Sequence, residues 1–205
     1  DYALGRIFGC LRENDLFKNT WIIFTADHGE MLGDHHMSQK NLFFEGSAHV
    51  PLLIMPPQGR SLPQNISVEA PTDLVDLYPT ILAMAGLSSP VSVSGRNLLE
   101  PVPMDRIFFG NSLNRNFCVM EEKLKLVYSA VGDHVLLFDL NTDPMEQHNL
   151  AEDPAWQERK AKLWKLLLEH TAQYSLSAGK TVSSLPTKRP ISPAMCPDGV
   201  WFPLS

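Results

Sequence analysis

The sequence lacks the features that mark proteins binding nucleic acids, spanning membranes or relying on disulfides. No basic cluster is longer than Lys188-Arg189, and the formal net charge is −6, so we predict no nucleic-acid partner. No apolar run approaches the roughly 20 residues that cross a bilayer, so we predict no membrane span. Its three cysteines, Cys10, Cys118 and Cys196, lie far apart without a C-x-x-C spacing, which argues against a zinc knuckle or a disulfide scaffold.

The first residues lack an initiator methionine and a signal peptide. Residues 1–17 instead place Leu4, Ile7, Phe8 and Leu11 at helical spacing, a pattern typical of an amphipathic helix. Because this helix is already under way at the first residue, we expect the sequence to be a piece of a longer chain. The compartment in which the protein works is therefore not predicted.

The first half of the sequence alternates helical and strand patterns. Residues 21–26 form a short, continuously apolar run, typical of a strand buried on both faces in a parallel sheet. Residues 50–55 predict a second strand, and residues 72–87 predict a helix that Gly86 ends as its C-cap. We therefore expect residues 1–103 to belong to an α/β layer domain.

The second half has a different pattern. Short β-like runs separated by turn residues predict an antiparallel meander, at 107–109, 117–120, 124–128 and 135–138. Asp153-Pro154 then supplies an N-cap and a first-turn proline for a helix. We expect residues 104–174 to form a small antiparallel subdomain with this helix. Residues 175–205, with five prolines, are expected to form an extended tail.

Polar residues follow the first predicted strand, where ligands bind in open α/β sheets. Asp27 and His28 supply a carboxylate oxygen and an imidazole nitrogen, both natural ligands for a divalent cation. Residues 30–48 form a long polar loop, which is usually functional, and its Lys40 could hold an anionic ester oxygen. The alternatives are a helix-capping aspartate with an incidental histidine, and a solvated surface lysine.

Several segments that follow one another along the chain indicate a family more specifically than these single residues do. They are N-T-W-I-I-F-T-A-D-H-G-E-M-L-G-D-H at residues 19–35, and the segments 40–52, 76–86, 94–98 and 137–150. In order and spacing they closely resemble the sulfatase family of the alkaline-phosphatase superfamily. The resemblance implies the C-terminal part of an alkaline-phosphatase-like α/β fold, with a mixed or parallel sheet sandwiched by helices. A small antiparallel sheet packed with a C-terminal helix would follow.

The resemblance also implies a metal and sulfate site. Asp27 and His28 occupy the positions of two ligands to a divalent metal, usually Ca²⁺. Histidine in the second position is similar to the branch of choline-sulfatase-like and phosphonate-monoester-hydrolase-like enzymes, where Mn²⁺ is also found. Lys40 matches the family lysine that contacts the sulfate group. His35 lines the same loop, and His49 stands where many relatives carry arginine; both are candidate substrate contacts.

The nucleophile that the resemblance implies is missing from the sequence. Sulfatases oxidise the first residue of a C/S-x-P-x-R motif to formylglycine, and no such motif occurs among these residues. We expect the formylglycine in an N-terminal part of the same enzyme, which would hydrolyse a small-molecule or saccharide sulfate ester. Two protein ligands are few for calcium, so we expect this chain alone to bind metal weakly without turnover. The alternatives are a phosphonate or phosphate ester hydrolase, and a nonenzymatic binding module lacking the catalytic half.

Overall fold

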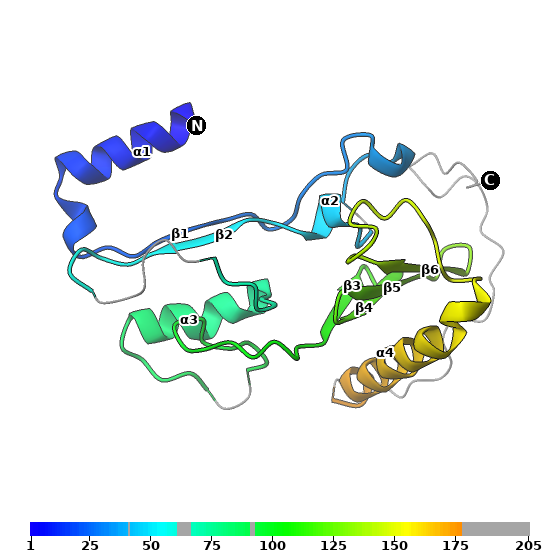
Figure 1. The fold of residues 1–205 in the computed structure, drawn as a ribbon. Helices are drawn as coiled ribbons and strands as arrows, with labels where there is room; N and C mark the ends of the chain where they lie inside the picture. The colour runs from blue at the N-terminus through cyan, green and yellow to red at the C-terminus, as the bar shows by residue number, and fades with distance from the viewer. Residues whose placement is uncertain (41, 61–66, 91–92, 178–205) are drawn as a thin grey trace. The chain divides into compact units, whose positions relative to one another are not determined.

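A computed structural model describes residues 1–40, 42–60, 67–90 and 93–177 (Figure 1). The chain divides into two compact units. The first consists of Asp1–Asp27 and Val50–Met104, and the second of His28–His49 and the described residues from Asp105 onward. The segment 28–49, which carries four of the five candidate site residues, therefore groups with the C-terminal sheet, a grouping that the sequence did not predict.

The first unit begins with the predicted amphipathic helix, α1 (Tyr2–Glu13). A 3₁₀ turn leads from it to β1 (Ile22–Thr25), which pairs with β2 (Leu52–Met55) in an antiparallel two-stranded sheet. The predicted helix over 72–87 is confirmed as a 3₁₀ turn followed by α3 (Leu77–Met84). Gly86, with a φ of 73°, ends it as expected.

The prediction for β1 was wrong in one respect. We expected the run 21–26 to be buried on both faces between parallel neighbours. In the structure its described partner is the antiparallel β2, and the side chains of Phe24 and Leu53 are 38% and 59% exposed. Burial of both faces requires covering layers on both sides of a strand, and the described residues of this unit do not cover Phe24.

A buried carboxylate fixes the segment after α3. The carboxylate of Asp76 accepts hydrogen bonds from the backbone N–H groups of Asp73 (2.8 Å) and Arg96 (2.7 Å). The Thr80 hydroxyl accepts another from Leu98 N–H (2.9 Å). A Cβ at Gly95 would lie 2.1 Å from the backbone oxygen of Val75, so the chain approaches the 3₁₀ turn before α3 as closely as glycine allows. The motif segments 76–86 and 94–98 therefore have a structural explanation.

The second unit contains the predicted antiparallel meander. Its four strands are hydrogen-bonded in sequence order, each antiparallel to the next: β3 (Phe108–Ser112), β4 (Asn116–Glu121), β5 (Leu124–Ser129) and β6 (His134–Asp139). The turn between β4 and β5 holds Glu122 and Lys123, with φ of 50° and 66°. Positive φ at both positions matches the right-handed twist of the flanking strands.

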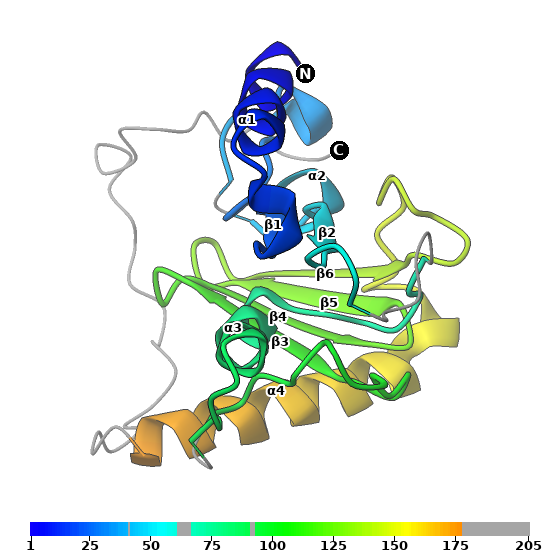
Figure 2. The ribbon, with the colours of Figure 1, turned by 90° about the vertical axis from the view of Figure 1, so that its left-hand side faces the viewer.

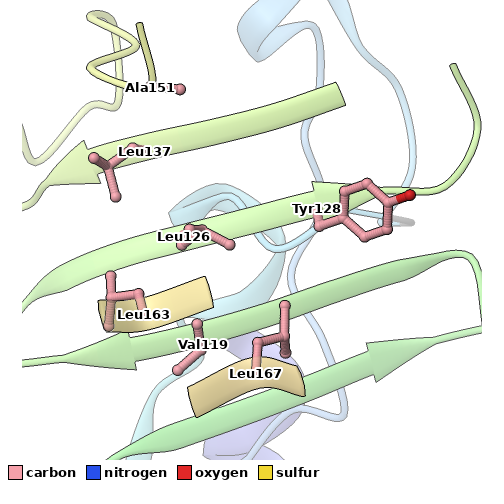
Figure 3. Close-up of a cluster of buried hydrophobic side chains, with 7 residues drawn as sticks. All are labelled: Val119, Leu126, Tyr128, Leu137, Ala151, Leu163 and Leu167. Atoms are coloured by element: carbon pink, nitrogen blue, oxygen red, sulfur yellow. The ribbon is translucent and has the colours of Figure 1, made fainter. Parts of the chain in front are cut away.

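One face of this sheet is covered by α4 (Gln157–Ser177), which runs along it in Figure 2. Asp153 caps the preceding 3₁₀ turn by accepting from Ala155 N–H (2.9 Å), as predicted. The core between helix and sheet, drawn in Figure 3, consists of Val119, Leu126, Tyr128, Leu137, Ala151, Leu163 and Leu167. The helix includes residues 175–177, the first three of the predicted tail, and residues 178–205 lie outside the described part of the chain.

The other face of the sheet is covered by the segment 28–49. Phe138 of β6 packs there with Met31, Leu42 and Phe44 of that segment. Because side chains alternate along a strand, Lys125 of β5 points to the opposite face from its buried neighbour Leu126. The sheet is thus a layer between α4 and the loop that carries the candidate site.

No described helix is both long and apolar enough to cross a membrane.

Candidate functional site

The two candidate metal ligands follow β1 directly. Asp27 is exposed and ends the first segment of the first unit, while His28 is half-buried and begins the second unit. The Nδ1 atom of His28 lies 2.8 Å from the carbonyl oxygen of Gly29. Since a carbonyl only accepts hydrogen bonds, Nδ1 carries the proton, and a neutral imidazole then has its lone pair on Nε2. That arrangement, with the second nitrogen held by a carbonyl, is common among metal-binding histidines.

Gly29 holds the backbone beside His28 in place. Its N–H donates to the carbonyl oxygen of Ser47 (2.8 Å). A Cβ at this position would lie 2.2 Å from the carbonyl oxygen of Gly46, a distance that no side chain tolerates. The glycine after Asp27-His28 is therefore required by the close approach of the two backbones, and His28 is positioned by the segment 46–47.

The loop between His28 and α2 (Glu45–Ala48) is folded back on itself. Met31 N–H donates to Gln39 O (3.0 Å), and the Met31 side chain is buried. Four loop residues other than glycine have positive φ: Leu32 (51°), His35 (52°), His36 (57°) and Gln39 (71°). Such conformations cost roughly 1–2 kcal/mol each and concentrate at functional sites. Lys40 follows at the end of this loop with an exposed side chain.

His35 forms part of a small hollow. Its ring stacks on Phe44, with centroids 4.2 Å apart and planes inclined by 16°. The hollow has a volume of about 190 Å³ and is lined by Met31, Asp34, His35, Glu45, Gly46 and residues 144–147. The structure thus places the candidate His35 beside carboxylates of the loop and of the turn after β6.

A buried charge cluster, formed by Glu45, Lys125 and Glu146, lies at the base of this loop. The ammonium of Lys125 is 2.6 Å from Glu45 Oε1 and 2.7 Å from Glu146 Oε1. The side chains of Lys125 and Glu146 are only 3% and 2% exposed, and lysine is almost never buried to this degree unless it is paired. His49 joins the cluster from outside, since its Nδ1 lies 2.9 Å from Glu45 Oε2 while its side chain is 77% exposed.

A tight turn after β6 presents Glu146. The carboxylate of Asp143 accepts hydrogen bonds from the N–H groups of Gln147 (3.0 Å) and His148 (2.8 Å). Partial burial raises the pKa of Asp143, but these hydrogen bonds and the neighbouring His148 outweigh it, so the pKa lies below its ordinary value. The segment 137–150, which resembles sulfatases, therefore contains the end of β6 and this turn.

The structure brings some of the candidate residues together. His35 and His49 both lie beside Glu45, whereas Lys40 is outside the cluster. Among the described residues, no three His, Cys, Asp or Glu side chains are arranged to hold a metal ion. Asp27 and His28 therefore do not complete a metal site with the described side chains.

Sequence reasoning missed Lys125 and Glu146. Lys125 lies between Leu124 and Leu126, and this alternation suggests a lysine on a solvent-exposed face. Its buried neighbour Cys118 has no catalytic signal, because burial raises the pKa of the thiol to about 12 and keeps it protonated. The sequence did contain a signal for this ion pair. Lys125 is a charged residue within an apolar strand, and Glu146 is an acidic residue within the 137–150 motif.

Comparisons with known proteins agree with the sequence and the fold. The family model described as Sulfatase matches residues 1–87. Arylsulfatase K of Xenopus laevis is 34% identical over 171 residues, which are 74% of this chain and 31% of that protein. The uncharacterized sulfatase YidJ of Escherichia coli (strain K12) is 31% identical over 182 residues, which are 83% of this chain and 35% of that protein.

A solved structure extends the agreement to three dimensions. Phosphonate monoester hydrolase of Agrobacterium radiobacter is 32% identical, with a TM-score of 0.65 over 83% of this chain and 38% of that chain. The match confirms the predicted fold class. The chain spans about a third of the length of the curated relatives that it matches. From the co-linear motifs, the fold and these relatives together, we conclude that the chain belongs to the sulfatase family.

Proposed function

We propose that the full-length protein is a sulfatase, which hydrolyses R–O–SO₃⁻ with water to R–OH and hydrogen sulfate. The observation that carries the proposal is the match of the Sulfatase family model to residues 1–87. That range contains all five candidate site residues, Asp27, His28, His35, Lys40 and His49. The substrate would be a small-molecule or saccharide sulfate ester.

Asp27 and His28 would ligate a divalent cation, Ca²⁺ or alternatively Mn²⁺. The donor set fits, because one carboxylate and one imidazole with its Nδ1 directed to a carbonyl suit such an ion. When bound, the cation would supply positive charge to neutralise the developing charge on the sulfate group. Calcium takes six to eight oxygen ligands, so further ligands would come from other parts of the full-length enzyme.

Lys40 would contact the sulfate group as a compact positive charge. Its exposed side chain, at the end of the folded loop, suits a residue that meets a ligand from outside this chain. His35, on the wall of the hollow, and the exposed His49 would contact the rest of the substrate. A formylglycine supplied by the N-terminal part would be the nucleophile.

The test is to measure metal content and aryl sulfate hydrolysis of the full-length protein. Lys40→Ala is expected to lower kcat/KM by about 100-fold or more, because it removes a charge that contacts the reacting group. Lys18→Ala is the control, because Lys18 is also an exposed lysine and pairs with Asp15 (3.0 Å). This substitution should leave kcat/KM unchanged. Wild-type protein without bound metal, or without hydrolysis of any sulfate ester, would contradict the proposal.

A second candidate is hydrolysis of phosphonate monoesters on the same scaffold. It is favoured by the 32% identity to the solved structure named as a phosphonate monoester hydrolase. Side-by-side kcat/KM values for an aryl sulfate and an aryl phosphonate monoester distinguish the two. A larger value for the phosphonate ester would assign the second function, and the roles proposed for Asp27, His28 and Lys40 would remain the same.

A further inference from the structure

The ammonium of Lys125 is held by two hydrogen bonds and an additional ion pair. It donates hydrogen bonds to Glu45 Oε1 (2.6 Å) and to the carbonyl oxygen of Phe43 (2.8 Å), and it forms an ion pair with Glu146 Oε1 at 2.7 Å. Phe43 and Glu45 belong to the segment 43–47, and Glu146 belongs to the turn after β6. Lys125 of the antiparallel sheet therefore binds the segment 43–47 at one backbone carbonyl, that of Phe43, and at one side chain, that of Glu45.

Glu146 holds the same segment from a second direction. Its Oε2 accepts from the backbone N–H of Glu45 (2.7 Å) while its Oε1 faces Lys125. The ring of Phe43 packs so closely on Gly110 of β3 that a Cβ there would lie 2.4 Å from it. Two carboxylates around one buried ammonium are a weak source of stability, because desolvation offsets the attraction. Position rather than stability is the function that this geometry suggests.

The held segment in turn positions the candidate metal ligand. Within it, the Ser47 hydroxyl donates to Phe44 O (3.1 Å), and Ser47 O accepts from Gly29 N–H (2.8 Å). Gly29 also lies close to the backbone of Gly46, since a Cβ at Gly29 would be 2.2 Å from Gly46 O. A shift of the segment 43–47 would therefore be transmitted to Gly29 and to His28 beside it.

From these contacts we propose that Lys125 is a positioning residue for the metal and sulfate site. Its ammonium, with Glu146, holds the segment 43–47 on the antiparallel sheet, and that segment fixes the backbone of His28. Through this segment, Lys125 and Glu146 would affect the affinity for the metal and the rate of ester hydrolysis without contacting the metal or the sulfate ester. This inference rests on the proposed function for its catalytic consequence, but the positional effect itself can be measured independently.

The test compares variants of the full-length protein. Lys125→Met with Glu146→Gln removes the ion pair between these two residues without leaving a charged carboxylate buried at position 146, and Lys125→Arg keeps the positive charge. Lys162→Met is the matched control, because Lys162 pairs with Glu121 on the surface of the same unit. The first readout is backbone amide exchange, measured separately for residues 28–49 and for the β4–β5 core at residues 116–129.

Exchange in residues 28–49 is expected to rise about tenfold in the double variant, and the 116–129 core to stay near the wild-type rate. Lys125→Arg should restore most of the protection, and Lys162→Met should leave both segments unchanged. Equal acceleration of both segments would show a merely structural role and overturn the inference. Unchanged exchange in residues 28–49 would overturn it as well.

The second readout is turnover of an aryl sulfate together with bound metal. The double variant is expected to lose about tenfold or more in kcat/KM and in metal affinity, the size typical of lost supporting contacts around a metal ligand. Wild-type turnover and metal affinity in the double variant would overturn the inference and leave the proposed function intact. If the wild-type enzyme hydrolyses no sulfate ester, the proposed function fails, and amide exchange alone decides the positional role.

Discussion

Gly29→Ala is the sharpest test of how the candidate metal ligand is held. Gly29 is not among the glycines with positive φ, so its backbone conformation is open to any residue. The obstacle is space alone, because the new methyl group would lie 2.2 Å from Gly46 O, 3.2 Å from Gly46 C and 3.4 Å from Ser47 Cα. All three atoms belong to the backbone and cannot rotate away.

The magnitude follows from two costs. Separating the chains to an ordinary contact distance requires a movement of about 1 Å, which breaks the 2.8 Å bond from Gly29 N–H to Ser47 O. A lost hydrogen bond costs about 1 kcal/mol and overpacking about 1–3 kcal/mol, so we expect destabilisation of about 2–4 kcal/mol. The same movement displaces His28, so metal affinity should fall about tenfold or more.

The assay is urea unfolding followed by tryptophan fluorescence, to which Trp156 and Trp164 of the second unit contribute, together with metal content of the full-length protein. Gly5→Ala is the control, because nothing lies within 4 Å of a Cβ at Gly5 in the helix α1. It should be neutral or stabilise by up to about 1 kcal/mol. A Gly29→Ala protein with wild-type stability and metal content would refute the reasoning that this close approach positions His28.

Three further predictions concern the second unit. Leu163→Ala, at a 1% exposed core position, should lower the free energy of unfolding by about 2–5 kcal/mol in urea titrations, and a loss below about 1 kcal/mol would contradict the assigned core. Gly110→Ala should cost about 1–3 kcal/mol, because its methyl would lie 2.4 Å from the ring of Phe43, whose carbonyl is held by Lys125. The lowered pKa of Asp143 stabilises the folded state above the unfolded value of 3.8 and ceases to do so as pH falls through the lower folded value. Stability measured between pH 6 and pH 2 should therefore fall less steeply in Asp143→Asn, and identical pH profiles would exclude this contribution.

Local elements were predictable because their determinants lie within a few residues of each other. The Asp153-Pro154 start of the last helix and the glycine end of α3 are both observed. The meander was predictable for the same reason, since alternation and short turns act between neighbouring strands. The burial of the run 21–26 was not, because it depends on what covers each face, and Phe24 remains 38% exposed in the described structure.

The sequence by itself determined the family and named the candidate site residues. The motif around Asp27-His28-Gly29 and Lys40 is contiguous, so it can be read without coordinates, although the roles of these residues stay predictions. Only the tertiary structure decided what supports them. Lys125 lies 80 residues from Glu45 along the chain, and Glu146 lies 101 residues from it. The alternating strand pattern predicts that Lys125 and Leu126 lie on opposite faces of the sheet. It does not predict that a loop covers the face on which Lys125 lies. That covering arises from long-range packing, which turns an apparently solvent-facing lysine into a buried ion-pair partner.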